Sequence, residues 1–146
     1  MSGEAARPAR RRLYLDTSAY LCVLLAEEGS GRLSADTEGA ELLSSVLLIL
    51  EAKRTLTRLA RDGALSADQY AACIDRLEQD TQLFVLRDLT LDLCQSGVLP
   101  AVLTPRSLDL AHLRTALWFH RADPIDRFVT MDTSQAQAAK ELGLPV

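Results

Sequence analysis

The chain has 146 residues, which is enough for one domain with a packed core and too few for two. Hydrophobic residues make up 48% and charged residues 25%, as in an ordinary globular protein, and no apolar run reaches the roughly 18 residues that a membrane span needs. The net charge of −4 argues against a protein that coats nucleic acid without specificity. It does not exclude a nuclease, because a cluster of metal-binding carboxylates would itself make the total more negative.

The N-terminal residues 1–12 are polar and basic, and we expect them to form a flexible tail before a single domain over 13–146. The apolar run that follows is interrupted by Asp16 and lacks a cleavage pattern, which argues against a signal peptide. Three cysteines, Cys22, Cys73 and Cys94, form no C-x-x-C pair and lie in apolar periodic segments. We therefore expect buried free thiols and a reducing cytoplasm.

Short apolar segments alternate with longer helical patterns along the rest of the chain. The predicted strands cover 12–16, 40–44, 83–86 and 127–130, with a last edge strand beginning at 145–146. The predicted helices cover 19–26, 32–38, 46–62, 66–80, 89–97, 107–120 and 134–142. This alternation predicts right-handed β-α-β crossovers and a mostly parallel sheet with helices on both faces.

Ligands of such sheets bind beyond the carboxyl ends of the strands, and two aspartates stand there. Asp16 directly follows Leu13-Tyr14-Leu15, at the carboxyl end of the first predicted strand, and Asp132 follows the predicted strand 127–130. Each could also serve only as the N-cap of the next helix. Two such aspartates in one small sheet nevertheless favour a shared site.

Glu51 and Asp109 are the other acids of interest. Glu51 lies in the apolar run 46–52, so we expect it to be partly buried, with either Arg54 or a metal site as its partner. Asp109 lies in the first turn of a predicted helix, where the helix dipole alone could explain it.

The four acids together predict a cation site. Two such charges about 5 Å apart repel by roughly 3 kcal/mol at an effective dielectric of about 20. Three such pairs would cost about 10 kcal/mol, as much as a typical domain's whole stability. Oxygen ligands without histidine or cysteine suit Mg²⁺ or Mn²⁺, and such a site can hydrolyse phosphodiesters.

Four segments in this order resemble the PIN domain, most closely VapC-type toxins: LYLDTSAYL, SSVLLILEAKR, RSLDLAHLRTAL and FVTMDTSQAQAAKELGLPV. The resemblance covers 13–146. It implies an α/β/α sandwich around a parallel sheet and an Mg²⁺- or Mn²⁺-dependent endoribonuclease. It also implies a homodimer that a VapB-like antitoxin inhibits, with RNA as the substrate.

The resemblance also assigns residues by motif position. Asp16 and Asp109 would be the firmest metal ligands, and Asp132 and Glu51 would complete the set and orient water. Ser18 and Thr130 match small polar positions that support the acids by hydrogen bonds, while His112 matches a packing position.

The remaining features leave alternatives open. Positive charge on the helix of Glu51 indicates either a solvated face or a rim that guides RNA, and Arg114 allows the same two interpretations. Trp118 is expected to pack in the core or at a dimer contact. The alternative functions are a PIN fold that has lost catalysis and binds RNA or protein, and a structure-specific DNA nuclease. The complete acidic set argues against the first, and the short chain argues against the second.

Overall fold

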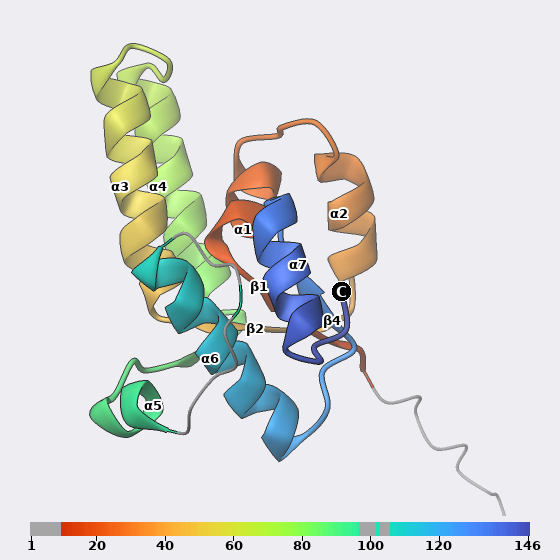
Figure 1. Ribbon diagram of the computed structural model, residues 1–146. Coiled ribbons are helices and arrows are strands. Elements are labelled where there is room, and N and C mark those ends of the chain that lie inside the picture. The colour runs from red at the N-terminus through yellow and green to blue at the C-terminus, as the bar shows by residue number, and fades with distance from the viewer. Residues whose placement is uncertain (1–9, 97–101, 103–105) are drawn as a thin grey trace, which may run out of the picture.

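The computed structural model describes residues 10–96, 102 and 106–146, and these form a parallel sheet with the strand order β3-β2-β1-β4. The strands are β1 (Arg12–Leu15), β2 (Glu41–Ser45), β3 (Phe84–Arg87) and β4 (Arg127–Val129). The helices are α1 (Thr17–Leu24), α2 (Ser30–Thr37), α3 (Leu47–Arg61), α4 (Ala67–Thr81), α5 (Leu91–Gln95), α6 (Ser107–Ala122) and α7 (Thr133–Glu141). The predicted α/β fold with a parallel central sheet and covering helices is confirmed (Figure 1).

The sheet separates two hydrophobic layers because successive side chains of a strand point to opposite faces. Tyr14 of β1 packs with Phe128 of β4 and with buried residues of α6 and α7. Its neighbours Leu13 and Leu15 pack instead with α1 and α2. The two layers hold β1 at the centre of the molecule, so the residue that follows it is fixed in position.

Helices α3 and α4 lie side by side at one end of the molecule (Figure 1). Their contact with α1 is built from Tyr20, Leu48, Leu56 and Leu77, which are all buried. The start of α4 is set by Ser66, whose side chain accepts from the Gln69 backbone, while the Gln69 side chain accepts in return from the Ser66 backbone. This reciprocal capping satisfies two donors at the N-terminus and explains why a helix begins here.

The hydroxyl of Tyr20 forms a polar contact at the border of this apolar layer. Its hydroxyl donates to Oδ2 of Asp80 at 2.8 Å, and Arg76 holds the same carboxylate. Burial, with help from Asp80, raises the pKa of Tyr20 well above its usual value, so the hydroxyl stays protonated and keeps donating. Tyr20→Phe should therefore lower the free energy of unfolding by about 1 kcal/mol, measured by urea denaturation.

The matched control is Tyr70→Phe, because the Tyr70 hydroxyl has only a 3.4 Å contact to Thr57 near the surface. We expect that change to stay within about 0.5 kcal/mol of the parent. Equal stability of the two variants would show that the Tyr20 hydroxyl adds nothing to the packing of α1 on α4.

Several boundaries differ from the predictions. Helix α1 begins at Thr17 rather than 19, because Asp16 itself is the N-cap. Helix α5 is shorter than 89–97, because Thr90 caps it and it ends at Gln95. The predicted strand at 145–146 is absent from the described structure, although the Phe128 N–H donates to the carbonyl of Pro145 at 2.6 Å.

Two other expectations need correction. Arg12 is not part of a flexible tail, since it lies in β1 and its backbone N–H donates to Asp126 at 2.7 Å; residues 1–9 lie outside the described residues. Cys22 is buried as expected, but Cys73 is only partly buried and Cys94 is exposed. Cys94 is exposed because the short α5 buries only Leu93.

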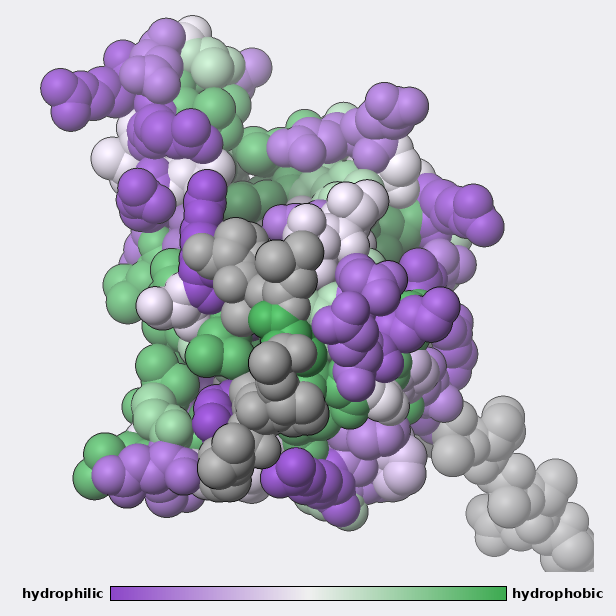
Figure 2. Space-filling view, in the orientation of Figure 1, coloured by the Kyte–Doolittle hydropathy of each residue, from purple (hydrophilic) through white to green (hydrophobic). Residues whose placement is uncertain are grey.

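The surface around α5 carries exposed apolar side chains, Leu91 above all (Figure 2). Within the described part of the chain, no helix is both long and apolar enough to cross a membrane.

Candidate active site at the carboxyl edge of the sheet

Four carboxylates meet at one edge of the sheet because the strands are parallel and all end there. Asp16 follows β1 directly, and Asp132 follows β4 as the N-cap of α7. Glu51 lies in the second turn of α3, which follows β2 almost without a loop, and Asp109 lies in the first turn of α6. They surround a pocket of about 290 Å³, whose lining is Asp16, Thr17, Ser18, Glu51, Arg106, Asp109, His112 and Asp132.

Asp16 is the most buried of the four, with only 5% of its surface exposed. Its carboxylate accepts from the Ala19 backbone and from the Ser18 hydroxyl at 2.7 Å, and its second oxygen accepts from the Thr130 hydroxyl. Burial raises the pKa of Asp16, and these hydrogen bonds oppose the rise. Asp16 is thus both a helix cap and a member of the pocket, and the two interpretations of its position are compatible.

Glu51 is held by a chain of buried polar groups that starts inside the protein. His112 donates from Nε2 to Glu51 Oε1 at 2.7 Å, and the Thr17 hydroxyl donates to the same oxygen at 2.8 Å. The other nitrogen of His112, Nδ1, is hydrogen-bonded to the fully buried Tyr14 hydroxyl at 2.8 Å. Arg54, the alternative partner considered from the sequence, forms no ion pair with Glu51.

This network keeps Glu51 ionised. Burial disfavours its charge, but the hydrogen bond and charge of His112, together with Thr17, outweigh burial and lower the pKa of Glu51. Because both contacts use Oε1, the other oxygen, Oε2, accepts no hydrogen bond from any described residue.

The negative charges of the other three carboxylates affect the pKa of Asp109. Its pKa is raised by burial and then by the negative charges of Asp132, Asp16 and, to a smaller extent, Glu51, while Arg106 lowers it. The backbone at this position is fixed by the buried Gln135 side chain, which donates to the Asp109 carbonyl at 2.8 Å. The effect of the three neighbouring acids on this pKa has the direction that the charge repulsion expected from the sequence requires.

Asp132 caps α7 through a single oxygen. Oδ1 accepts from the backbone N–H groups of Ser134 and Gln135 at 2.8 and 3.3 Å. The other oxygen accepts no hydrogen bond from the described residues. As at Asp16, the capping role and a place in the pocket go together.

Three residues that line this pocket were not predicted as site residues from the sequence: Thr17, Arg106 and His112. The sequence indicated no site role for Thr17 and only a packing role for His112, yet both form hydrogen bonds with Glu51. His112 is indeed 2% exposed, so the expectation of packing was sound but incomplete. A histidine three residues after Asp109 lies one helical turn further on the same face, and this spacing is the signal that could have found it.

The donor chemistry of the pocket fits a hard divalent cation. Within the described residues no three His, Cys, Asp or Glu side chains are grouped so as to hold a metal ion in this conformation. However, Asp109 accepts no side-chain hydrogen bond there, and Glu51 and Asp132 each keep one carboxylate oxygen without a donor. Carboxylate oxygens that lack donors and repel one another are the ligands that Mg²⁺ and Mn²⁺ bind.

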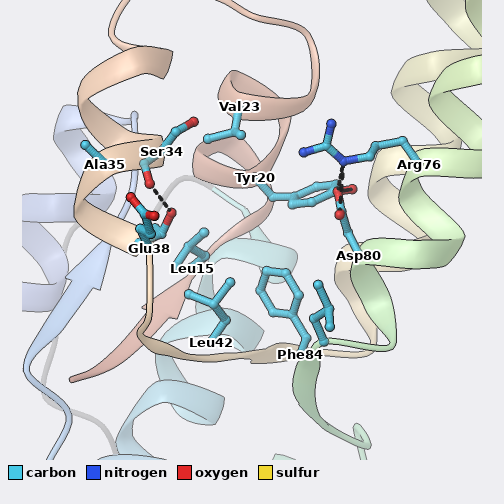
Figure 3. Close-up of a pocket in the computed structure, with 12 residues that line it drawn as sticks. Leu15, Tyr20, Val23, Ser34, Ala35, Glu38, Leu42, Arg76, Asp80 and Phe84 are labelled. Atoms are coloured by element: carbon cyan, nitrogen blue, oxygen red, sulfur yellow. Dashed lines mark hydrogen bonds and ion pairs between the residues drawn. The ribbon is translucent and has the colours of Figure 1, made fainter. Parts of the chain in front are cut away.

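A larger apolar cavity, of about 570 Å³, lies elsewhere, between α1, α2, β2 and α4 (Figure 3). Leu15, Leu42 and Phe84 point into it from the sheet, and the hydrogen-bonded group of Tyr20 and Asp80 borders it. None of the four carboxylates lines this cavity. This cavity is therefore separate from the acidic pocket, and its larger size does not make it part of the candidate active site.

No protein-family model matches the chain. Two curated proteins are similar to it, both named Ribonuclease VapC35, from the Mycobacterium tuberculosis strains CDC 1551 / Oshkosh and ATCC 25618 / H37Rv. Each is 29% identical over 137 residues, which is 92% of this chain and 94% of the relative.

The parallel α/β fold with covering helices has the architecture of a PIN-like sandwich, and the acidic pocket lies at its carboxyl edge. Similarity to the two relatives extends over nearly the whole chain, and it confirms the predicted resemblance to the PIN-domain family and to its VapC-type members.

Proposed function

We propose that this protein is a metal-dependent endoribonuclease, the toxin of a type II toxin–antitoxin pair. One observation carries the proposal: Asp16, Glu51, Asp109 and Asp132, which are far apart in the sequence, line one pocket at the carboxyl edge of the sheet. The similar proteins are named ribonucleases, which supports RNA as the substrate.

The proposed reaction is hydrolysis by water, without a covalent intermediate. The four carboxylates would hold Mg²⁺ or Mn²⁺. When bound, such an ion activates water, neutralises the phosphate and stabilises the leaving oxygen. A serine–histidine–aspartate mechanism does not fit, because His112 is bound to Glu51 and Tyr14.

The protein's own part in this reaction is to position the acids. Ser18 and Thr130 fix the carboxylate of Asp16 from two sides. His112 and Thr17 hold one oxygen of Glu51, which lines the pocket, and no described residue donates to the other oxygen. Loss of a hydrogen bond that orients a metal ligand typically lowers metal affinity or activity by about 10- to 100-fold.

The test is cleavage of total RNA by the purified protein, with the cut sites mapped. With Mg²⁺ or Mn²⁺ we expect cuts at defined sites, and with excess chelator we expect cleavage to fall by at least about 100-fold. Adding the metal back in excess should restore it. Equal cleavage with and without chelator would contradict the metal-dependent mechanism.

The same experiment separates the two alternative functions. A protein that binds RNA or a protein but neither cleaves nor binds Mg²⁺ or Mn²⁺ would be a non-catalytic PIN module. A protein that cuts flap-containing DNA in preference to RNA would be a structure-specific DNA nuclease.

The resemblance to VapC-type toxins also implies a setting for the activity. We propose a VapB-like antitoxin as the partner, a homodimer as the assembly and the cytoplasm as the compartment. A small gene immediately upstream that encodes a DNA-binding protein would support the partner. Light scattering on the purified chain would measure the assembly.

A further inference from the structure

A second pocket, of about 380 Å³, opens beside the acidic one. The two share five lining residues, Thr17, Ser18, Glu51, Arg106 and Asp109, so they form one continuous depression. The character of the lining changes along it, because the second pocket adds Arg54 and Arg58 from α3. An acidic end thus leads into a basic end.

In the described part of the chain, the arginines of the basic end are not held in ion pairs, although the charge of Arg106 acts on Asp109. Arg54 and Arg58 are exposed and lie four residues apart on α3, which places them about 6 Å apart along the helix axis. Within the described residues, neither of them nor Arg106 forms an ion pair, although Asp62 stands four residues after Arg58. A guanidinium without a carboxylate partner keeps all its N–H donors available.

An RNA strand that approaches the acids needs cations on its path, because carboxylates repel phosphates. Guanidinium groups bind phosphate oxygens with paired N–H donors, which ammonium groups cannot do in the same geometry. Two apolar side chains, Leu21 and the 41% exposed Leu108, also line this pocket, so a base or ribose could contact them while the phosphates face the arginines.

We infer that Arg54, Arg58 and Arg106 form a phosphate-binding track, which holds the RNA backbone on one side of the bond to be cut and leads it into the acidic pocket. This inference rests on the proposed function. It replaces the solvated-face interpretation of Arg54 and Arg58, and it is independent of which RNA sequence is recognised.

The test measures binding of a labelled single-stranded RNA to the Asp109→Asn protein, which should bind without cutting. Adding Arg54→Ala and Arg58→Ala should weaken binding at least about tenfold at low salt. Each phosphate contact on a single strand contributes about 0.7 to the slope of log K against log salt, so the slope should become shallower by about 1.4.

The matched control carries Arg32→Ala and Lys140→Ala, which remove the same charge from exposed positions on α2 and α7, outside both pockets. We expect its affinity to stay within about twofold of the parent, because distant exposed charges are screened. Thermal melting of both double variants shows that they fold alike. Equal weakening by the control pair would mean that total charge alone matters, and would overturn the track.

Cleavage kinetics separate this inference from the proposed function. In the protein with Asp109 intact, the Arg54→Ala/Arg58→Ala pair should raise KM about tenfold with kcat nearly unchanged, since a track binds substrate and transition state alike. Unchanged KM and unchanged salt slope, in a protein that still cuts RNA, would overturn the track and leave the nuclease standing. No cleavage by the parent, with the binding loss still present, would instead overturn the nuclease and leave an RNA-binding track.

Discussion

The Asp109→Asn protein is expected to lose at least about 100-fold of its RNA cleavage and to keep its fold. Changes to groups that only support a metal ligand cost about 10- to 100-fold, so loss of a ligand should cost at least the upper figure. The fold should survive because the Asp109 side chain makes no hydrogen bond in the described structure and its backbone is held by Gln135. Cleavage of a labelled RNA at saturating Mg²⁺ measures the effect.

The same variant should be more stable than the parent when metal is absent. The pKa of Asp109 is raised by burial and by its acidic neighbours, so the folded state binds its proton more tightly than the unfolded state does. The ionised carboxylate of Asp109 therefore lowers the free energy of unfolding at pH values above its folded-state pKa. This loss is absent at pH values below the ordinary pKa of aspartate, where the group is protonated in both states. Solvent screening of a half-exposed group keeps the gain below about 1 kcal/mol at neutral pH.

Thermal melting with and without Mn²⁺ completes the test. Mn²⁺ that binds only the folded protein should raise the melting temperature of the parent, and it should raise that of Asp109→Asn much less. The control is Asp75→Asn, because Asp75 is exposed on α4 and lies outside both pockets. If Asp109→Asn cut RNA as well as the parent, the assignment of this acid would be wrong.

The second large effect is expected at His112. His112→Ala removes a buried side chain that bonds both Tyr14 and Glu51, so it leaves a cavity and two polar groups without their partner. We expect a loss of about 3 kcal/mol in the free energy of unfolding, measured by urea denaturation. Cleavage should fall by about 10- to 100-fold, because the Glu51 carboxylate loses a bond that fixes its direction.

Two further substitutions separate the packing role of His112 from its positioning role. Glutamine can place an amide near Nε2, the atom that bonds Glu51, whereas asparagine can place one near Nδ1, the atom that bonds Tyr14. If His112 acts through Glu51, His112→Gln should retain more cleavage than His112→Asn at similar stability. Activity that simply follows stability across the three variants would show that His112 is only a core residue.

The element pattern was predictable because it depends on neighbours in the sequence. Strands that alternate with helices were correctly placed, and the capping pair of Ser66 and Gln69 marks the start of α4 by local hydrogen bonds alone. The fold class followed, since parallel strands with helical connections allow few arrangements. The exposure of Cys94 was not predictable, because α5 is too short for periodicity to show which of its residues are buried.

Only part of the candidate site could be predicted from neighbouring residues in the sequence. The sequence by itself determined that Asp16 and Asp132 follow strands and cap helices, because those roles are set within a few residues. Only the tertiary structure decided that Glu51 pairs with His112, which is 61 residues away, and not with Arg54 one turn along its own helix. The physical reason is that the fold brings the buried His112 of α6 to 2.7 Å from the partly buried carboxylate of Glu51, whereas the exposed Arg54 is held by solvent.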